Sequence, residues 1–421
     1  MALSVSDEVV ATVRRRAVIW RPQAWYLAPV TIIVAGVSLF GRAEFAHSAV
    51  WAVDAALTSI YVLWPIALGV SAVPVIRLRR TASRELLEAL PTGAQWRVMV
   101  MSAAWPGIWI CAGLLLGTAL ALGVAGWHGS PPSLRAVAPL APALIGTMAM
   151  GALGGACAVL VPNWAVPPLL SVTAFTCLVF DVAGLRALTD FVGATGSVVV
   201  AMQLRPVVLL GLCGAFAGLV LASLAVSAAF MTGLRRWWIV AAVAGATAVL
   251  VLATADLRTP RTWADDAGWP CTPVPATDTE VCLPPDQRAM TDVVSEALTP
   301  TATRLVELDP GLATARFSPN AAAAGAAGQR PTVWITLPVG QAGTATDEMV
   351  HAVTDGLAVC WGPDSTGGEE MTMARAMVVL QWWLAPNLVP DEALLEAYGI
   401  AERAPTHSEA QQAYAVLTEC A

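Results

Sequence analysis

Seven long apolar stretches in the first 255 residues constrain the fold more than any other feature of this chain. About 20 consecutive apolar residues in a helix are needed to cross the hydrocarbon core of a bilayer. The stretches are Trp25–Gly41, Leu57–Ile76, Val98–Gly126, Ala136–Val161, Ala165–Ala183, Val207–Met231 and Trp237–Ala255. We therefore expect a mainly α fold, a polytopic membrane helix bundle with about seven helices.

Composition agrees with this expectation and excludes one class of activity. The chain is 57% hydrophobic and 13% charged, whereas soluble domains carry roughly 25% charged residues. It contains no lysine, and a nucleotide-binding Walker loop requires a lysine beside the phosphates. The chain is thus not expected to be an ATPase or another enzyme, and any ATP-driven work would need a separate polypeptide.

Charge divides the chain into two regions. Residues 1–255 hold 15 arginines and 8 acidic residues, whereas residues 256–421 hold 8 arginines and 22 acidic residues. We expect an interfacial amphipathic helix in 1–24, a transmembrane domain in 25–255, a Pro-rich linker in 256–285 and a mostly helical soluble domain with little β structure in 286–421. Nucleic-acid binding is disfavoured because the only large polar region is acidic.

Arginine placement predicts the orientation, because cytoplasmic loops of membrane proteins are enriched in arginine and lysine. With a cytoplasmic N-terminus, the inner segments hold Arg14, Arg15, Arg16, Arg21, Arg77, Arg79, Arg80, Arg84, Arg97, Arg235 and Arg236. The outer loops before the last span hold only Arg42, Arg135, Arg186 and Arg205. We therefore expect a multi-pass protein of the cell membrane with an extracytoplasmic C-terminal domain.

The loop 77–97 between the second and third spans carries the strongest functional signal. Ser83 can cap a short amphipathic helix that Pro91 stops. One side of that helix holds Leu86, Leu87 and Leu90, and the other holds Arg84, Glu85 and Glu88. A short helix with an acidic face on the inner membrane surface suits the docking of a soluble partner.

In this loop the chain resembles the permease subunits of bacterial ABC-2-type transporters. Their loop often reads as an arginine, a spacer and then Glu-Leu-Leu-x-x-Leu-Pro. The matching residues here are Arg80, Glu85, Leu86, Leu87, Leu90 and Pro91. The resemblance covers about residues 7–233 and implies six spans, a coupling loop that sits on a separately encoded ATPase, and a dimer with itself or with a sister permease. It implies export of an unidentified substrate.

A seventh span and an outer domain depart from that family pattern and leave two other hypotheses open. In one, the chain is a membrane-anchored receptor whose acidic outer domain binds an envelope component without transport. In the other, it is a membrane-anchored hydrolase that uses His351.

Three charged residues lie near the outer ends of the spans, namely Asp54, Asp181 and Arg205. Ionisable groups inside a membrane are costly and are often functional. We expect these three to reach water at the interface.

Four cysteines of the C-terminal region predict two disulfides, because an even set in an extracytoplasmic domain commonly pairs. Three pairings are possible, and we favour Cys271 with Cys282 and Cys360 with Cys420.

The C-terminal region also contains one weak candidate for a metal site. Glu348, His351 and Asp355 fall on one helical face. The HExxH pattern of zinc peptidases is absent, so a solvated face is the preferred interpretation, and no cofactor is expected. The expected elements here are helices Asp286–Leu298, Thr346–Trp361, Glu369–Leu384, Asp391–Tyr398 and Ser408–Thr418 and a strand Thr332–Leu337.

Overall fold

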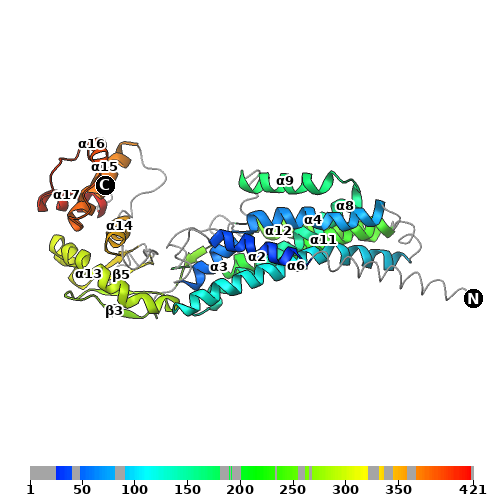
Figure 1. The fold of residues 1–421 in the computed structure, drawn as a ribbon, viewed down its shortest axis with the longest axis horizontal. Helices are drawn as coiled ribbons and strands as arrows, with labels where there is room; N and C mark the ends of the chain where they lie inside the picture. The colour runs from blue at the N-terminus through cyan, green and yellow to red at the C-terminus, as the bar shows by residue number, and fades with distance from the viewer. Residues whose placement is uncertain are drawn as a thin grey trace, which may run out of the picture.

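The computed structural model describes residues 25–39, 48–80, 91–180, 189, 191, 201–232, 235–254, 261–264, 268–320, 331–335, 345–357 and 367–418. It is mainly helical and elongated (Figure 1). A bundle of helices forms one part, and the elements from β3 (Cys271–Pro273) onward lie together at one end of it (Figure 1). The prediction of a mainly α chain is confirmed.

Every predicted apolar stretch contains a helix. The bundle consists of α2 (Leu27–Leu39), α3 (Ala49–Leu57), α4 (Ile60–Arg80), α6 (Thr92–Trp127), α7 (Leu134–Val137), α8 (Leu140–Leu160), α9 (Val166–Val179), α11 (Pro206–Thr232) and α12 (Arg235–Thr254). Helix α8 packs against α4, α6 and α11, and α9 covers α4. Helix α3, nine residues long with Ser48 as its N-cap, was not predicted.

Four segments of the described residues are long and apolar enough to cross a membrane: Ile60–Arg79, Gln95–Trp127, Leu134–Leu160 and Pro206–Met231. The apolar helices Leu27–Leu39, Val166–Val179 and Arg236–Val249 are shorter. A helix of 14 residues such as α9 is about 21 Å long, less than the roughly 30 Å of a hydrocarbon core. A helical bundle that spans a membrane several times is therefore supported, whereas the count of seven crossings stays a prediction.

Glycines allow the bundle helices to approach closely. A Cβ added to Gly154 of α8 would lie 1.9 Å from the carbonyl oxygen of Leu68 in α4. A Cβ added to Gly113 of α6 would lie 2.5 Å from the carbonyl oxygen of Ala28 in α2. Membrane helices associate by this kind of close backbone packing, because lipid gives no hydrophobic force between them.

The C-terminal part combines a small sheet with helices. The strands β3 (Cys271–Pro273), β4 (Glu280–Cys282), β5 (Arg316–Ser318) and β6 (Thr332–Trp334) form one sheet in that order. Strands β3 and β4 are antiparallel, whereas β4–β5 and β5–β6 are parallel. The other elements are η4 (Pro285–Met290), α13 (Thr291–Leu308), η5 (Pro310–Thr314), α14 (Ala345–Leu357), α15 (Gly367–Leu384), α16 (Glu392–Ala397) and α17 (His407–Thr418).

Helix α13 corrects one predicted boundary. The sequence predicts a helix that ends at Leu298, but α13 continues through Pro300 to Leu308. A proline inside a helix costs roughly 3 kcal/mol. Leu298, Ala302 and Leu305 are all fully buried on one face of α13, and their burial on both sides of the proline offsets that cost.

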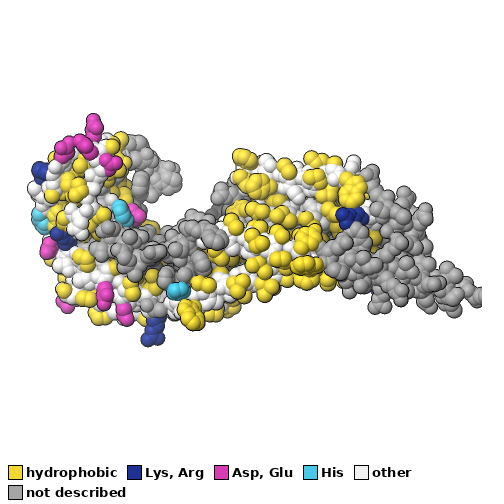
Figure 2. Space-filling model, viewed as in Figure 1, with side chains coloured by type: hydrophobic (Ala, Val, Ile, Leu, Met, Phe, Trp, Pro, Cys, Tyr) yellow, Lys and Arg dark blue, Asp and Glu magenta, His cyan; other side chains and the backbone are white. Residues whose placement is uncertain are grey.

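Surface chemistry differs between the two parts (Figure 2). Hydrophobic side chains cover the visible face of the bundle, and acidic side chains gather on the C-terminal elements (Figure 2). This difference agrees with the charge division seen in the sequence.

Candidate functional site

The bundle has two chemically different ends, and the end nearest the C-terminal part contains a buried ion pair. Arg261, in β2 (Arg261–Trp263), donates from Nη2 to Oδ1 of Asp54 in α3 at 2.5 Å. The side chains of Arg261 and Asp54 are only 8% and 5% exposed. The same Nη2 donates to the backbone carbonyl of Phe191 at 2.8 Å.

This arrangement corrects the expectation that Asp54 reaches water. The carboxylate lies within the packed end of the bundle, and a guanidinium 207 positions away balances its charge. A buried charge must be paired and hydrogen-bonded to be tolerated. Arg205 lies in the same region, just before α11, whereas Asp181 is outside the described residues.

Aromatic residues pack around the Phe191 side of this ion pair. The ring of Trp64 in α4 lies 6.3 Å from the ring of Phe191 and 5.2 Å from that of Phe216 in α11. Trp64 Nε1 donates to the hydroxyl of Thr147 in α8. The Asp54–Arg261 pair is therefore fixed to the same core that holds α4, α8 and α11 together.

A second ion pair joins the bundle to the C-terminal part. Arg135 of α7 contacts Asp286 of η4 at 2.9 Å, and the Asp286 side chain is 4% exposed. Burial raises the pKa of Asp286 above its usual value, and the charge of Arg135 acts in the opposite direction. The guanidinium thus stabilises the ionised form only in part.

Backbone pairing strengthens the same junction. Strand β1 (Met202–Leu204), which precedes α11, pairs antiparallel with β2, which follows α12. The side-chain amide of Asn320 donates to the carbonyl of Ala264 directly after β2. The segment after the last apolar helix is therefore bound both to the bundle and to the C-terminal sheet.

The opposite end of the bundle contains arginines and the two helix ends that flank the predicted coupling loop. Arg79 of α4 donates to the carbonyl of Val159 in α8, and its guanidinium lies 5.2 Å from the centre of the Phe230 ring in α11. Arg77 lies 5.9 Å from the centre of the Trp164 ring. Positively charged side chains are visible at this end in Figure 2.

The predicted coupling residues are only partly described. Arg80 is the last residue of α4, and Pro91 is the exposed N-cap of α6. Arg84, Glu85, Leu86, Leu87, Glu88 and Leu90 lie outside the described residues, so the amphipathic helix in this loop stays a prediction.

One predicted disulfide is confirmed. Cys271 and Cys282 face each other on β3 and β4 and form a disulfide with a Cα–Cα distance of 4.1 Å. Cys360 and Cys420 are outside the described residues. Among the described residues, one group has metal-ligand spacing, Cys271, Glu280 and Cys282. Its two sulfur atoms are already bonded to each other, so the group does not form a metal site.

The weak metal candidates of α14 do not form such a group among the described side chains. His351 and Asp355 are both exposed. The pKa of Asp355 is raised, because nearby protein atoms displace water that would stabilise the ionised carboxylate. The charge of His351 has a smaller effect in the opposite direction. Glu348 lies in α14, and its side chain is outside the described set.

Comparison of the chain with protein-family models, curated proteins and solved structures finds no match. The fold alone therefore defines the class. It is a mainly helical protein, and the four long apolar helices among its described residues fit a location in a membrane. The Asp54–Arg261 pair was missed by sequence reasoning, although a lone acid in an apolar segment and an arginine just after the last apolar segment were both visible signals.

Proposed function

We propose that this chain is the membrane-spanning permease subunit of an ABC-2-type exporter, driven by a separate ATPase that docks on residues 77–97. One observation carries the proposal. The segment that resembles the family's coupling loop connects α4 to α6 in the chain, and the helix ends that flank it lie at the arginine-rich end of the bundle, away from the C-terminal part (Figure 1).

The lengths of the flanking helices support this role. Helix α6 has 36 residues and is therefore about 54 Å long, longer than the roughly 30 Å hydrocarbon core. A continuous helix of this length, which includes Pro106, reaches from the loop toward the far side of the bundle and can carry a displacement along it. Its C-terminal end lies near the junction, because Ser130 accepts a hydrogen bond from the backbone N–H of Ala49, at the start of α3.

The test is co-purification of the full chain with an ATPase encoded beside it, followed by measurement of ATP hydrolysis in vesicles. We expect the permease to stimulate hydrolysis and the double variant Glu85→Arg with Glu88→Arg to abolish the stimulation, because it reverses the charge of the docking face. Glu392→Arg with Glu396→Arg makes the same charge change on exposed positions of α16 and serves as the matched control.

Unchanged stimulation in the Glu85 and Glu88 variant would overturn docking on this loop. Absence of any associated ATPase, together with a phenotype that survives scrambling of residues 81–90, would favour the receptor hypothesis instead.

A further inference from the structure

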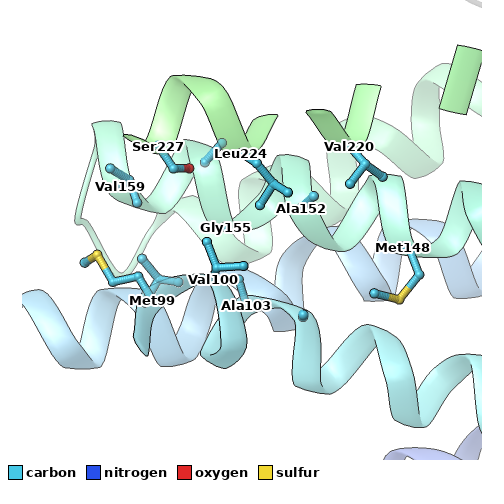
Figure 3. A pocket seen from close by; sticks show the side chains of 13 residues that line it. Met99, Val100, Ala103, Met148, Ala152, Gly155, Val159, Val220, Leu224 and Ser227 are labelled. Atoms are coloured by element: carbon cyan, nitrogen blue, oxygen red, sulfur yellow. The ribbon is translucent and has the colours of Figure 1, made fainter. Parts of the chain in front are cut away.

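A groove on the bundle lies between α6 and α11, with α8 as its floor (Figure 3). Its volume is about 120 Å³. Met99, Val100 and Ala103 line it from α6, and Val220, Leu224 and Ser227 line it from α11. The labelled side chains of both walls surround the groove in Figure 3.

Small residues of the floor keep the groove open. Ala152 and Gly155 of α8 both line it. A Cβ on Gly155 would come within 2.6 Å of the Cβ of Ala103, so α8 and α6 are in direct contact at this point and a larger residue would force them apart. The groove thus depends on particular short side chains.

The lining favours an apolar occupant. The one hydroxyl among the lining residues, Ser227 Oγ, already donates to the carbonyl of Ser223 in its own helix. A water molecule needs two to four polar partners to occupy a cavity, and a cavity of roughly 150 Å³ lined by hydrocarbon groups binds a small apolar molecule instead. A hydrocarbon chain meets this requirement.

Positive charge lies at one end of the groove. Val159 lines the groove, and its carbonyl accepts a hydrogen bond from Arg79. Arg97 is exposed and precedes Val100 by three residues and Ala104 by seven, which places the three on one face of α6. Two guanidinium groups, one from α4 and one from α6, therefore border the end of an apolar groove.

We propose that this groove binds an anionic phospholipid, with one acyl chain between α6 and α11 and the phosphate at Arg79 and Arg97. Basic pockets between membrane helices bind phosphate head groups in this way. An acyl chain leaves one apolar environment for another, so it gains little from the hydrophobic effect. The selectivity of the site therefore depends on the head group, and the proposal is independent of whether an ATPase drives the protein.

The test uses the full chain in vesicles of equal parts phosphatidylglycerol and phosphatidylcholine. In one sample phosphatidylglycerol carries a photoreactive diazirine on its acyl chain, and in a parallel sample phosphatidylcholine does. The adducts on the protein are mapped by mass spectrometry. We expect adducts on groove residues such as Val100 and Leu224 to favour phosphatidylglycerol by roughly five-fold for each contributing arginine.

Two sets of variants separate the parts of the proposal. Ala152→Leu fills the floor and is expected to remove the groove adducts, whereas Ala217→Leu on the exposed face of α11 leaves them unchanged.

Arg79→Gln with Arg97→Gln is expected to bring the ratio of phosphatidylglycerol adducts to phosphatidylcholine adducts to one. Arg236→Gln at the same end of the bundle is expected to leave this ratio as it is in the unaltered protein. Val100→Phe fills the groove from the α6 wall and replaces Ala152→Leu if that variant does not fold.

Three outcomes would overturn the proposal. Equal labelling of the unaltered protein by the two lipids would show that the head group does not determine which lipid binds. Groove adducts that persist in both filling variants would place the lipid elsewhere. Absence of groove adducts from both lipids, together with a disulfide between two copies of a Leu224→Cys variant, would identify a second copy of this chain as the occupant.

Discussion

Asp54 and Arg261 are separated by 207 positions, yet their side chains make a direct contact in a buried part of the molecule. One residue belongs to α3, between the first two long apolar segments, and the other follows α12. The pair therefore joins α3 to the strand that follows α12, and these two elements come from near the two ends of the apolar region. This contact holds α3 and β2 together.

Breaking the pair from one side should be costly. Arg261→Met leaves the Asp54 carboxylate buried without the guanidinium that balances its charge. Loss of one partner of a buried ion pair typically costs about 3–5 kcal/mol, whereas replacing both partners by apolar residues costs far less. We expect Arg261→Met to lower the free energy of unfolding by about that amount and the double variant Asp54→Leu with Arg261→Met to regain most of it.

Unfolding in detergent micelles, followed by intrinsic fluorescence, measures this difference. Arg403→Met is the control, because it removes an exposed ion pair with Glu409 on the surface and should leave the transition almost unchanged. A double variant as unstable as Arg261→Met would contradict the assignment of the cost to the unbalanced charge.

Asp286 gives the junction a pH dependence of predictable sign. Burial raises the pKa of Asp286 in the folded state above the ordinary value of 3.8. At a pH between 3.8 and this raised pKa, the folded state therefore binds more protons than the unfolded state. The free energy of unfolding contributed by Asp286 is then fully present below pH 3.8 and decreases as the pH rises through the raised pKa.

The measurement compares the unfolding of the unaltered chain with that of Asp286→Asn from pH 3.5 upward. We expect the stability of the unaltered chain relative to the variant to fall with rising pH and then to level off. A rise over the same range would mean that the attraction of Arg135 outweighs the burial of the carboxyl group.

At the scale of elements, local patterns predicted the apolar helices well and the sheet poorly. Each apolar helix is a long run of one kind of residue, and hydropathy detects such runs without knowledge of the fold. Strands β3, β4 and β5 have three residues each, too few for an alternating pattern to appear. The disulfide was predicted because Cys271 and Cys282 are 11 positions apart, whereas no local signal connects Asp54 with Arg261.

The contact between α8 and α4 depends on Gly154. Because its added Cβ would lie 1.9 Å from the Leu68 carbonyl oxygen, Gly154→Ala must push the two helices apart. Overpacking of this kind typically costs about 1–3 kcal/mol. The same substitution at Gly123 of α6, which has no atom within 4 Å of an added Cβ, is the matched control.

Thermal unfolding in micelles compares the two glycine variants. We expect a clearly lower midpoint for Gly154→Ala and an equal or slightly higher midpoint for Gly123→Ala, since alanine favours helix more than glycine does. Equal midpoints would show that α4 and α8 can separate locally at little cost.

At the scale of the whole molecule, the two bundle ends make the predicted orientation testable. The exposed residues Arg97 and Glu396 lie at the arginine-rich end and in the C-terminal part, respectively. Because arginine-rich ends favour the cytoplasmic side, we expect a membrane-impermeant maleimide to label Glu396→Cys in intact cells and Arg97→Cys only after permeabilisation. Both variants carry Cys360→Ser and Cys420→Ser to lower background labelling. Labelling in the reverse order would show that the orientation is opposite to the predicted one. It would also contradict the proposed ATPase docking, because residues 77–97 would then face away from the cytosol.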